Sequence, residues 1–176
     1  MSEGKHTQLS RREFGKRTVI GATALTGFGI LKSAHAAETP MKIGLIGAGG
    51  RGTGAVQDAI QANSNIQLVA IGDFWLDRTK GAVKGFKDNE NLKDNIQVPD
   101  DAIYGGLDAY KKVLEHEVDY IILATPPGFR PLHFEAVVEA KKHCFCEKPV
   151  ATDPVGTRRF MAAAKKSEEL KLSVVA

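Results

Sequence analysis

The sequence predicts an α/β fold built on a doubly wound parallel sheet with helices on both faces. After residue 36, short apolar runs of β type alternate with longer segments of helical periodicity. One run, Val118 to Ala124, is nearly unbroken in its apolar character, which is typical of a strand covered on both faces. The 176 residues allow one compact domain with a core. We therefore expect a targeting segment over 1–36 and a single domain over 37–176.

Each element is predicted from its period and from the turn residues beside it. Strands are expected over 41–46, 66–71, 102–104, 118–124, 143–146 and 172–176. Helices are expected over 52–62, 76–86, 131–142 and 153–166, with a further helix opened by Asp108 as N-cap. Pro131 suits the first turn of its helix. The polar, Asn-rich segment 87–99 is expected to be a surface loop.

The first 36 residues have the features of an export signal. Ser10 to Lys16 reads SRREFGK and looks like the twin-arginine consensus S-R-R-x-F-x-K. A mildly apolar run over 19–31 and the small-x-small site Ala34-His35-Ala36 follow, so we expect cleavage after Ala36 and a periplasmic or otherwise exported protein. The run has about 13 residues, short of the roughly 20 that span a bilayer. The export machinery is an expected partner, a stable membrane anchor is not, and an uncleaved amphipathic N-terminus is the alternative.

The positive charge of the chain lies in this leader. Residues 1–36 hold six Lys or Arg against two Glu, whereas the remaining 140 residues hold 18 basic and 19 acidic side chains. Nucleic-acid binding therefore has no support from composition. Cys144 and Cys146 are too close along a strand to form a good disulfide, and no other cysteine is available to complete a metal site. We expect both to be buried core residues rather than redox groups or metal ligands.

A glycine motif follows the first strand. Gly47-Ala48-Gly49-Gly50-Arg51-Gly52 has the spacing G-x-G-x-x-G, it opens a helix, and Asp73 stands 21 residues beyond it at the end of the next strand. Gly47 permits the tight turn, Gly49 permits close approach of the pyrophosphate, and Gly52 permits close packing of helix and strand. Backbone N–H groups and the helix dipole then face the phosphates. A structural turn with a capping Asp is the alternative to dinucleotide binding.

Asp73 favours NAD over NADP. Its carboxylate is expected to accept hydrogen bonds from the adenosine ribose hydroxyls, and its charge repels a 2′-phosphate. Arg78 keeps NADP possible, because a nearby arginine offsets that repulsion. Arg51 either reaches the phosphates or lies in solvent.

Four predicted strand ends mark one crevice. In an open parallel sheet the ligand lies beyond the carboxyl ends of the strands, so Gly47, Asp73, Thr125 and Glu147 should line the same site. Thr125-Pro126-Pro127-Gly128 is either a plain turn or a wall beside the nicotinamide ribose. His133, in the first turn of the next helix, is either a polar surface group or a site residue.

Lys148 is the candidate catalytic residue. Glu147-Lys148-Pro149 follows a predicted strand, and a Glu-Lys pair is most often a solvated surface pair. Its place at the ligand edge favours a second interpretation. A lysine ammonium beside a substrate carbonyl or hydroxyl orients it and stabilises developing oxyanion charge, and burial beside a cofactor lets it exchange a proton.

GLIGAGGRG over 44–52, Asp73, ATPP over 124–127 and CEKP over 146–149, in this order, resemble the Gfo/Idh/MocA oxidoreductase family. The resemblance covers roughly residues 40–176. It implies an N-terminal Rossmann domain that binds NAD or NADP, with Lys148 contacting the substrate and with Glu147, Thr125 and Pro126 near the nicotinamide. It also implies a carbohydrate-type small-molecule substrate, a homo-oligomer when full length, and an exported member of the glucose–fructose oxidoreductase type.

The chain departs from the family pattern by stopping at Ala176, where the family enters a second, substrate-binding domain. We therefore expect a fragment of a longer protein that is inactive alone, with a natural single-domain nucleotide binder as the alternative. The expected activity is hydride transfer between a CH–OH carbon and nicotinamide. One alternative is a redox-neutral NAD-dependent glycosidase, against which Lys148 argues, since those relatives show Val there. The other is a non-catalytic cofactor-binding module.

Overall fold

The computed structural model describes residues 39–176. They form one six-stranded sheet, all parallel, in the order β3-β2-β1-β4-β5-β6. The strands are β1 Met41–Ile46, β2 Ile66–Asp73, β3 Ile103–Gly105, β4 Tyr120–Leu123, β5 His143–Cys146 and β6 Val174–Val175. The doubly wound fold that the sequence predicts is confirmed. The twin-arginine motif and the expected cleavage site lie outside the described residues.

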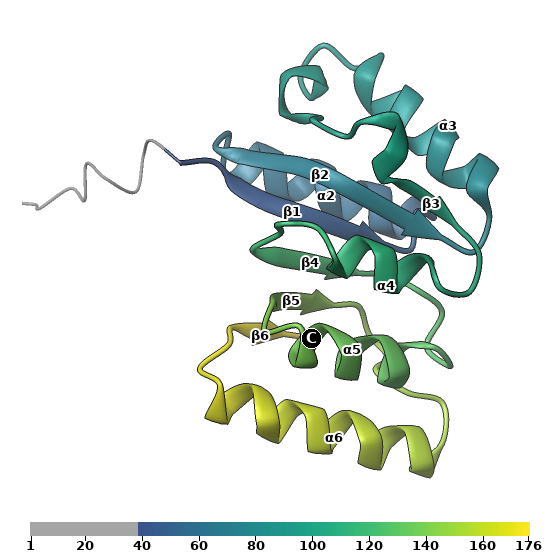
Figure 1. Ribbon diagram of the computed structural model, residues 1–176, viewed down its shortest axis with the longest axis vertical. Coiled ribbons are helices and arrows are strands. Elements are labelled where there is room, and N and C mark those ends of the chain that lie inside the picture. Colours follow the sequence, from purple (N-terminus) through teal and green to yellow (C-terminus); the bar gives the residue numbers. More distant parts are fainter. Residues whose placement is uncertain (1–38) are drawn as a thin grey trace, which may run out of the picture. The chain divides into compact units, whose positions relative to one another are not determined.

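Five α-helices connect these strands. They are α2 Gly50–Ala62, α3 Leu76–Lys87, α4 Ala109–Leu114, α5 Arg130–Glu139 and α6 Pro154–Glu169. Figure 1 shows α2 behind the sheet and α4 and α5 in front of it, so the two faces are covered by different helices. From β1 the chain adds β2 and β3 on one side, and it then returns across the sheet to add β4, β5 and β6 on the other. The strand order therefore reverses between β1 and β4. Within 39–176, no helix is long and apolar enough to cross a bilayer.

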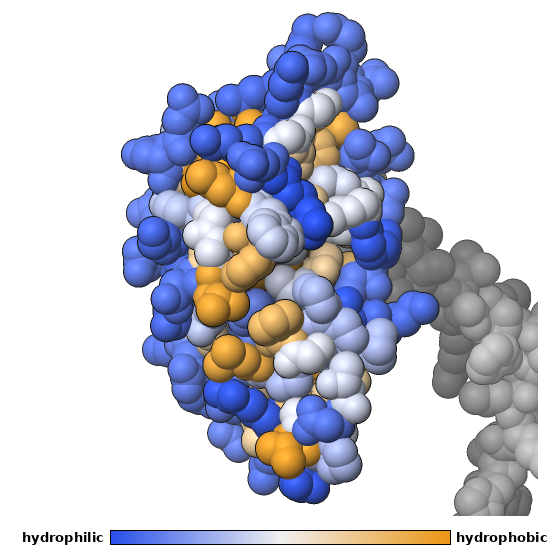
Figure 2. Space-filling model, turned by 90° about the vertical axis from the view of Figure 1, so that its right-hand side faces the viewer, coloured by the Kyte–Doolittle hydropathy of each residue, from blue (hydrophilic) through white to orange (hydrophobic). Residues whose placement is uncertain are grey.

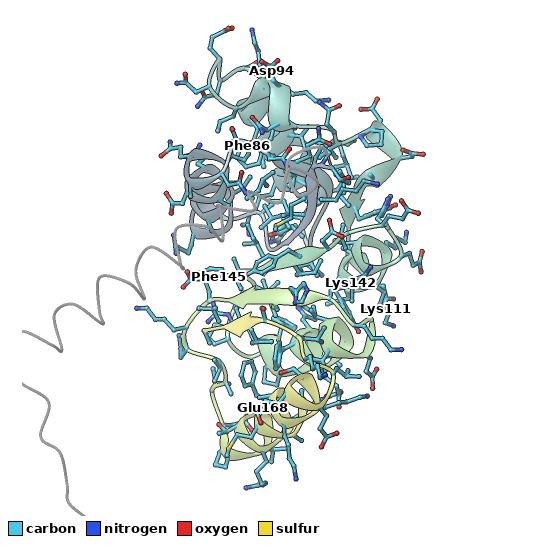
Figure 3. The ribbon with its side chains drawn as sticks, turned by 90° about the vertical axis from the view of Figure 1, so that its left-hand side faces the viewer. Phe86, Asp94, Lys111, Lys142, Phe145 and Glu168 are labelled. Carbon is cyan, nitrogen blue, oxygen red and sulfur yellow. The ribbon has the colours of Figure 1, made fainter. Side chains whose placement is uncertain are left out.

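The core lies on both faces of the sheet. Leu45, Leu68 and Ile121 from the central strands have no exposed surface. On one side Phe86 closes the last turn of α3 and is only 2% exposed (Figure 3). On the other, the fully buried Phe134 of α5 stacks on Phe160 of α6, with ring centroids 4.2 Å apart. The apolar stripes predicted for these helices therefore face inward.

The expectation of a surface loop over 87–99 is wrong for its apolar residues. Leu92, Ile96 and Val98 are at most 4% exposed, and the segment contains the 3-10 turn η1 Lys93–Asn95. Ile96 forms a parallel bridge with Leu68, next to which the Gln97 N–H donates to the Leu68 carbonyl. A second 3-10 turn, η2 Asp100–Ala102, leads into β3. The segment is therefore part of the core edge, because three apolar side chains anchor an otherwise polar sequence.

The aspartates at the start of α4 and α6 bond differently. Asp153 caps α6 through its side chain, accepting bonds from the Val155 and Gly156 amides at 2.9 Å. Asp108 is the N-cap residue of α4, as predicted, but its side chain makes no capping bond and pairs with Lys111 Nζ at 2.8 Å. The ion pair with Lys111 takes the place of the capping bond.

Cys144 and Cys146 are fully buried free thiols. Burial raises the pKa of the Cys146 thiol to about 11, and it also raises the pKa of the Cys144 thiol well above its usual value. Both thiols are therefore protonated at neutral pH. The prediction that they are core residues is confirmed.

Candidate functional site: a crevice at the carboxyl edge of the sheet

The turn after β1 requires glycine at two positions. Gly47 has φ +101°, and a Cβ there would lie 2.6 Å from the Ala124 carbonyl carbon and the Thr125 nitrogen. A Cβ on Gly52 would lie 1.9 Å from the Gly47 carbonyl oxygen. The first glycine thus lets the turn pass against the end of β4, and the last lets α2 pack onto the turn.

The next two glycines border open space. A Cβ built on Gly49 or Gly50 would meet nothing within 4 Å. The backbone bond from the Thr53 N–H to the Gly49 carbonyl marks the first turn of α2, and no side chain of the described residues caps this helix. The amides at the start of α2 are therefore left for a ligand, and the helix dipole favours an anionic one. A pyrophosphate fits this turn.

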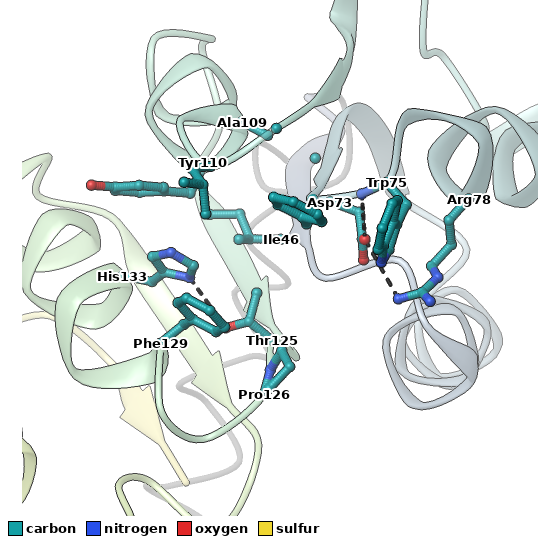
Figure 4. A pocket seen from close by; sticks show the side chains of 14 residues that line it. Ile46, Asp73, Trp75, Arg78, Ala109, Tyr110, Thr125, Pro126, Phe129 and His133 are labelled. Atoms are coloured by element: carbon teal, nitrogen blue, oxygen red, sulfur yellow. Dashed lines mark hydrogen bonds and ion pairs between the residues drawn. The ribbon is translucent and has the colours of Figure 1, made fainter.

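Asp73 braces the turn from the end of β2. Its Oδ2 accepts from the Ala48 N–H at 2.8 Å and its Oδ1 accepts from the Trp75 N–H at 3.0 Å. Arg78 lies beside it, with Nη1 3.5 Å from Oδ1, and is about half exposed (Figure 4). The carboxylate is buried at 8% exposure. The carboxylate that is predicted to bind the ribose hydroxyls is therefore held in a fixed orientation. Arg78 lies beside it, at the position from which an arginine offsets the repulsion of a 2′-phosphate.

A cavity of about 480 Å³ opens beside Asp73. Predicted site residues Asp73, Arg78, Thr125, Pro126 and His133 line it together with residues that the sequence did not single out as site residues: Ile46, Gly72, Phe74, Trp75, Gly106, Leu107, Ala109, Tyr110 and Phe129. Figure 2 looks onto this carboxyl edge and shows apolar side chains gathered among polar ones. A carboxylate on one wall and apolar or aromatic side chains on the others suit the adenosine half of a dinucleotide. Gly47, Pro127 and Glu147 do not line this cavity, so the expectation of a single crevice lined by all four strand ends holds only for Asp73 and Thr125.

His133 is a buried wall residue and not a polar surface group. Its Nδ1 lies 3.2 Å from Thr125 Oγ1, and its ring stacks on Tyr110 with centroids 4.2 Å apart (Figure 4). Phe129 stacks more loosely, at 6.0 Å. Burial lowers the pKa of His133 from 6.5 to about 4. The imidazole is therefore neutral at pH 7 and contributes a flat surface rather than a charge.

Arg51 is exposed, and it makes two ion pairs that the sequence did not predict. Its Nε donates to Glu147 Oε1 at 2.5 Å, and its Nη1 lies 3.5 Å from Asp58. The Glu147 hydrogen bond raises the pKa of Arg51. Glu147 is itself 7% exposed, with its N–H donating to the Leu123 carbonyl, and Lys148 beside it is exposed. The glycine turn and the E-K-P segment are thus joined by an ion pair between residues 96 positions apart.

Arg130 is a residue of the site that sequence reasoning missed. It is 6% exposed, its Nε donates to the Thr125 carbonyl at 2.6 Å, and its Nη1 donates to the Pro149 carbonyl at 2.5 Å. It therefore ties the loop after β4 to the loop after β5. One signal was present in the sequence: a cation in the first turn of a helix opposes the helix dipole, which indicates a tertiary role.

The chain matches the model of the Gfo/Idh/MocA family, an oxidoreductase family with an NAD-binding Rossmann fold, over residues 41–175. The chain belongs to this family. Its 130 aligned residues are 27% identical to an inositol 2-dehydrogenase of Acidothermus cellulolyticus, covering 74% of this chain and 34% of the relative. The chain thus spans about a third of the length of this curated relative.

Solved structures share the fold. The apo scyllo-inositol dehydrogenase of Lactobacillus casei superposes with a TM-score of 0.61 at 20% identity, over 78% of this chain and 37% of that one. The WlbA dehydrogenase of Bordetella pertussis, solved with NADH and UDP-GlcNAcA, superposes with a TM-score of 0.59 at 23% identity, over 78% of this chain and 35% of that one. The described residues are therefore the NAD-binding domain of a Gfo/Idh/MocA oxidoreductase. Among residues 39–176, no group of three His, Cys, Asp or Glu is placed to hold a metal ion.

Proposed function

We propose that the protein is an exported, NAD-dependent oxidoreductase that acts on a CH–OH group of a polyol or sugar. The observation that carries the proposal is the Asp73 carboxylate, held by the Ala48 amide directly beside the open start of α2. This arrangement supports a ribose acceptor beside a pyrophosphate site. The names of the relatives, inositol 2-dehydrogenases among them, support a polyhydroxylated substrate.

NAD is the preferred cofactor in this proposal. A 2′-phosphate would approach the buried Asp73 carboxylate, whose orientation is fixed by two backbone hydrogen bonds and whose charge repels the phosphate. Arg78 is about half exposed and 3.5 Å away, which makes its screening of that charge incomplete. We therefore expect NAD to bind at least about tenfold more tightly than NADP, a difference of about 1.4 kcal/mol.

Lys148 acts on the substrate hydroxyl. A bound nicotinamide supplies the hydride acceptor or donor. In this scheme the exposed Lys148 ammonium orients the substrate oxygen, stabilises its oxyanion charge and donates a proton to it when a carbonyl is reduced; when a hydroxyl is oxidised, the neutral amine takes the hydroxyl proton and passes it to solvent. The neighbouring Glu147 is already paired with Arg51, so it does not neutralise the lysine.

Two substitutions test this function in the full-length protein. Asp73→Ala removes the ribose acceptor and should raise the Kd for NAD, measured by calorimetry, by at least about tenfold. Lys148→Met should leave that Kd near the wild-type value and remove NADH formation with myo-inositol and with a panel of sugars. Lys165→Met, which changes an exposed lysine of α6, is the matched control. Unchanged NAD affinity in Asp73→Ala would overturn the cofactor assignment.

Export through the twin-arginine pathway is part of the proposal. The SRREFGK motif supports it, and a pathway that carries folded proteins allows the cofactor to be bound before export. We propose that NAD stays bound and is recycled by paired half-reactions. Replacing both Arg11 and Arg12 with lysine should retain the protein in the cytoplasm in a fractionation experiment. Rapid exchange of NAD from the purified protein would contradict the recycling.

A further inference from the structure

The E-K-P segment is held on both sides of its lysine. Before Lys148, the Glu147 carboxylate accepts from Arg51 at 2.5 Å. After it, the Pro149 carbonyl accepts from Arg130 at 2.5 Å. Lys148 itself is exposed, and within residues 39–176 its ammonium has no ion-pair partner. An exposed side chain therefore lies between two anchored residues, Glu147 through its carboxylate and Pro149 through its carbonyl.

Burial of the Arg130 cation has a free-energy cost that stability of the fold alone does not explain. The residue is only 6% exposed, and no carboxylate of the described residues pairs with its guanidinium. A buried cation without a counter-ion is costly, and an apolar side chain of similar volume would pack the same space at least as well. The guanidinium nevertheless has donors in a fixed fork, which suits two separate carbonyls. Its placement is explained by the two loops that it joins.

Those two loops carry the two halves of the proposed reaction site. Arg130 Nε bonds to the carbonyl of Thr125, a residue that lines the cavity beside Asp73. Its Nη1 bonds to the residue after Lys148. Arg51 makes the equivalent connection on the other side, from the glycine turn to Glu147. Each arginine therefore fixes the lysine relative to a different part of the cofactor crevice.

We propose that Arg130 and Arg51 are positioning residues that hold Lys148 at a fixed distance from the cofactor crevice. The inference rests on the proposed role of Lys148. Neither arginine touches the substrate in this scheme. Arg51 acts through the Glu147 carboxylate, and Arg130 acts through the Pro149 carbonyl. A shift of about 1 Å in a reacting group lowers rates by up to about a hundredfold, so the loss of one anchor should appear in kcat.

The experiment compares Arg130→Met, Arg130→Lys, Arg51→Met and the control Arg159→Met in the full-length protein. Arg159 makes an exposed ion pair with Glu135 and lies outside the crevice. At saturating NAD with myo-inositol as the probe, Arg130→Met should lower kcat at least about tenfold, and Arg130→Lys should recover part of it through one carbonyl. Arg159→Met should retain the wild-type kcat.

Hydrogen exchange provides a readout that does not depend on turnover. In protein without added substrate, the Glu147 amide, which donates to the Leu123 carbonyl, should exchange faster in Arg130→Met and in Arg51→Met, while the amides of 121–123 in β4 keep their protection. If Arg130→Met does not fold, Arg51→Met tests the same segment, since the Arg51 side chain is 56% exposed. Wild-type kcat and exchange in both Met variants would overturn the positioning role. If amide exchange becomes faster in the Met variants but Lys148→Met has no effect on turnover, only the proposed function is refuted.

Discussion

Replacing Gly52 with alanine tests whether the glycine turn and α2 are packed as closely as the structure indicates. The added Cβ would lie 1.9 Å from the Gly47 carbonyl oxygen, whereas real Cβ contacts essentially never fall below 3.0 Å. Because the obstacle is a backbone atom, no rotation of a side chain relieves the contact. The turn or the start of α2 must therefore move by about 1 Å.

The cost follows from what that movement disturbs. Overpacking costs about 1–3 kcal/mol, and the upper end is expected because the same turn carries the Ala48–Asp73 hydrogen bond. About 3 kcal/mol lowers the Tm of a domain of this size by roughly 10 °C. The movement also displaces the amides at the start of α2, so the Kd for NAD should rise at least about tenfold.

Gly54→Ala is the matched control in the same helix. A Cβ there meets nothing within 4 Å, and alanine in a helix interior is about 0.5–1 kcal/mol better than glycine. Gly54→Ala should therefore raise the Tm by a few degrees and leave the NAD affinity unchanged. Thermal unfolding followed by circular dichroism and NAD titration by calorimetry measure both quantities. Equal Tm and equal NAD affinity for the two variants would refute the close packing at Gly52.

Two further predictions concern buried titratable groups. The pKa of His133 is about 4 in the folded protein and 6.5 when unfolded, so the unfolded state binds the proton first as the pH falls. The contribution of His133 to the free energy of unfolding should be fully present above pH 7 and should fall by about 2 kcal/mol by pH 5. Urea unfolding measures this loss, and His133→Phe should reduce it. Equal pH dependence in His133→Phe would contradict the assigned pKa. Cys144 and Cys146 should resist a thiol reagent at pH 8 in the native protein and react once urea unfolds it, because burial keeps both thiols protonated and covered. Rapid labelling of the native protein would show that β5 opens.

The sheet and the glycine turn were predictable because their signals are local. A buried strand such as β4 shows a run of apolar residues, and the turn shows glycines at fixed offsets from a strand end. The prediction for segment 87–99 was wrong because its three apolar residues lie among polar residues with no helical or strand period. Their burial depends on Leu68, which lies more than twenty residues earlier in the chain. Composition alone does not contain that contact.

The sequence predicted polar residues of the site. It did not predict the apolar residues that line the cavity or the bonds by which Arg51 and Arg130 join its loops. Asp73 and Thr125 line the cavity as their places after strands indicate, and His133 of α5 lines it too. Trp75, Leu107 and Phe129 are exposed apolar residues of loops, and no periodicity marks such residues. Arg51 and Arg130 were visible as charges, but their partners Glu147 and Pro149 lie 96 and 19 residues away. Pairings at these separations are set by the tertiary fold.

The role of Asp73 in the free protein explains why the crevice is ready to bind. The carboxylate that is proposed to accept the ribose hydroxyls already accepts the Ala48 and Trp75 amides, so it is oriented before any ligand arrives. The Ala48 bond also fixes the glycine turn relative to β2, and Gly47 fixes it against the end of β4. Since these backbone groups lose little further freedom on binding, less of the interaction energy is lost to ordering. A preorganised turn of this kind favours the slow cofactor release that the proposed recycling of a bound NAD requires.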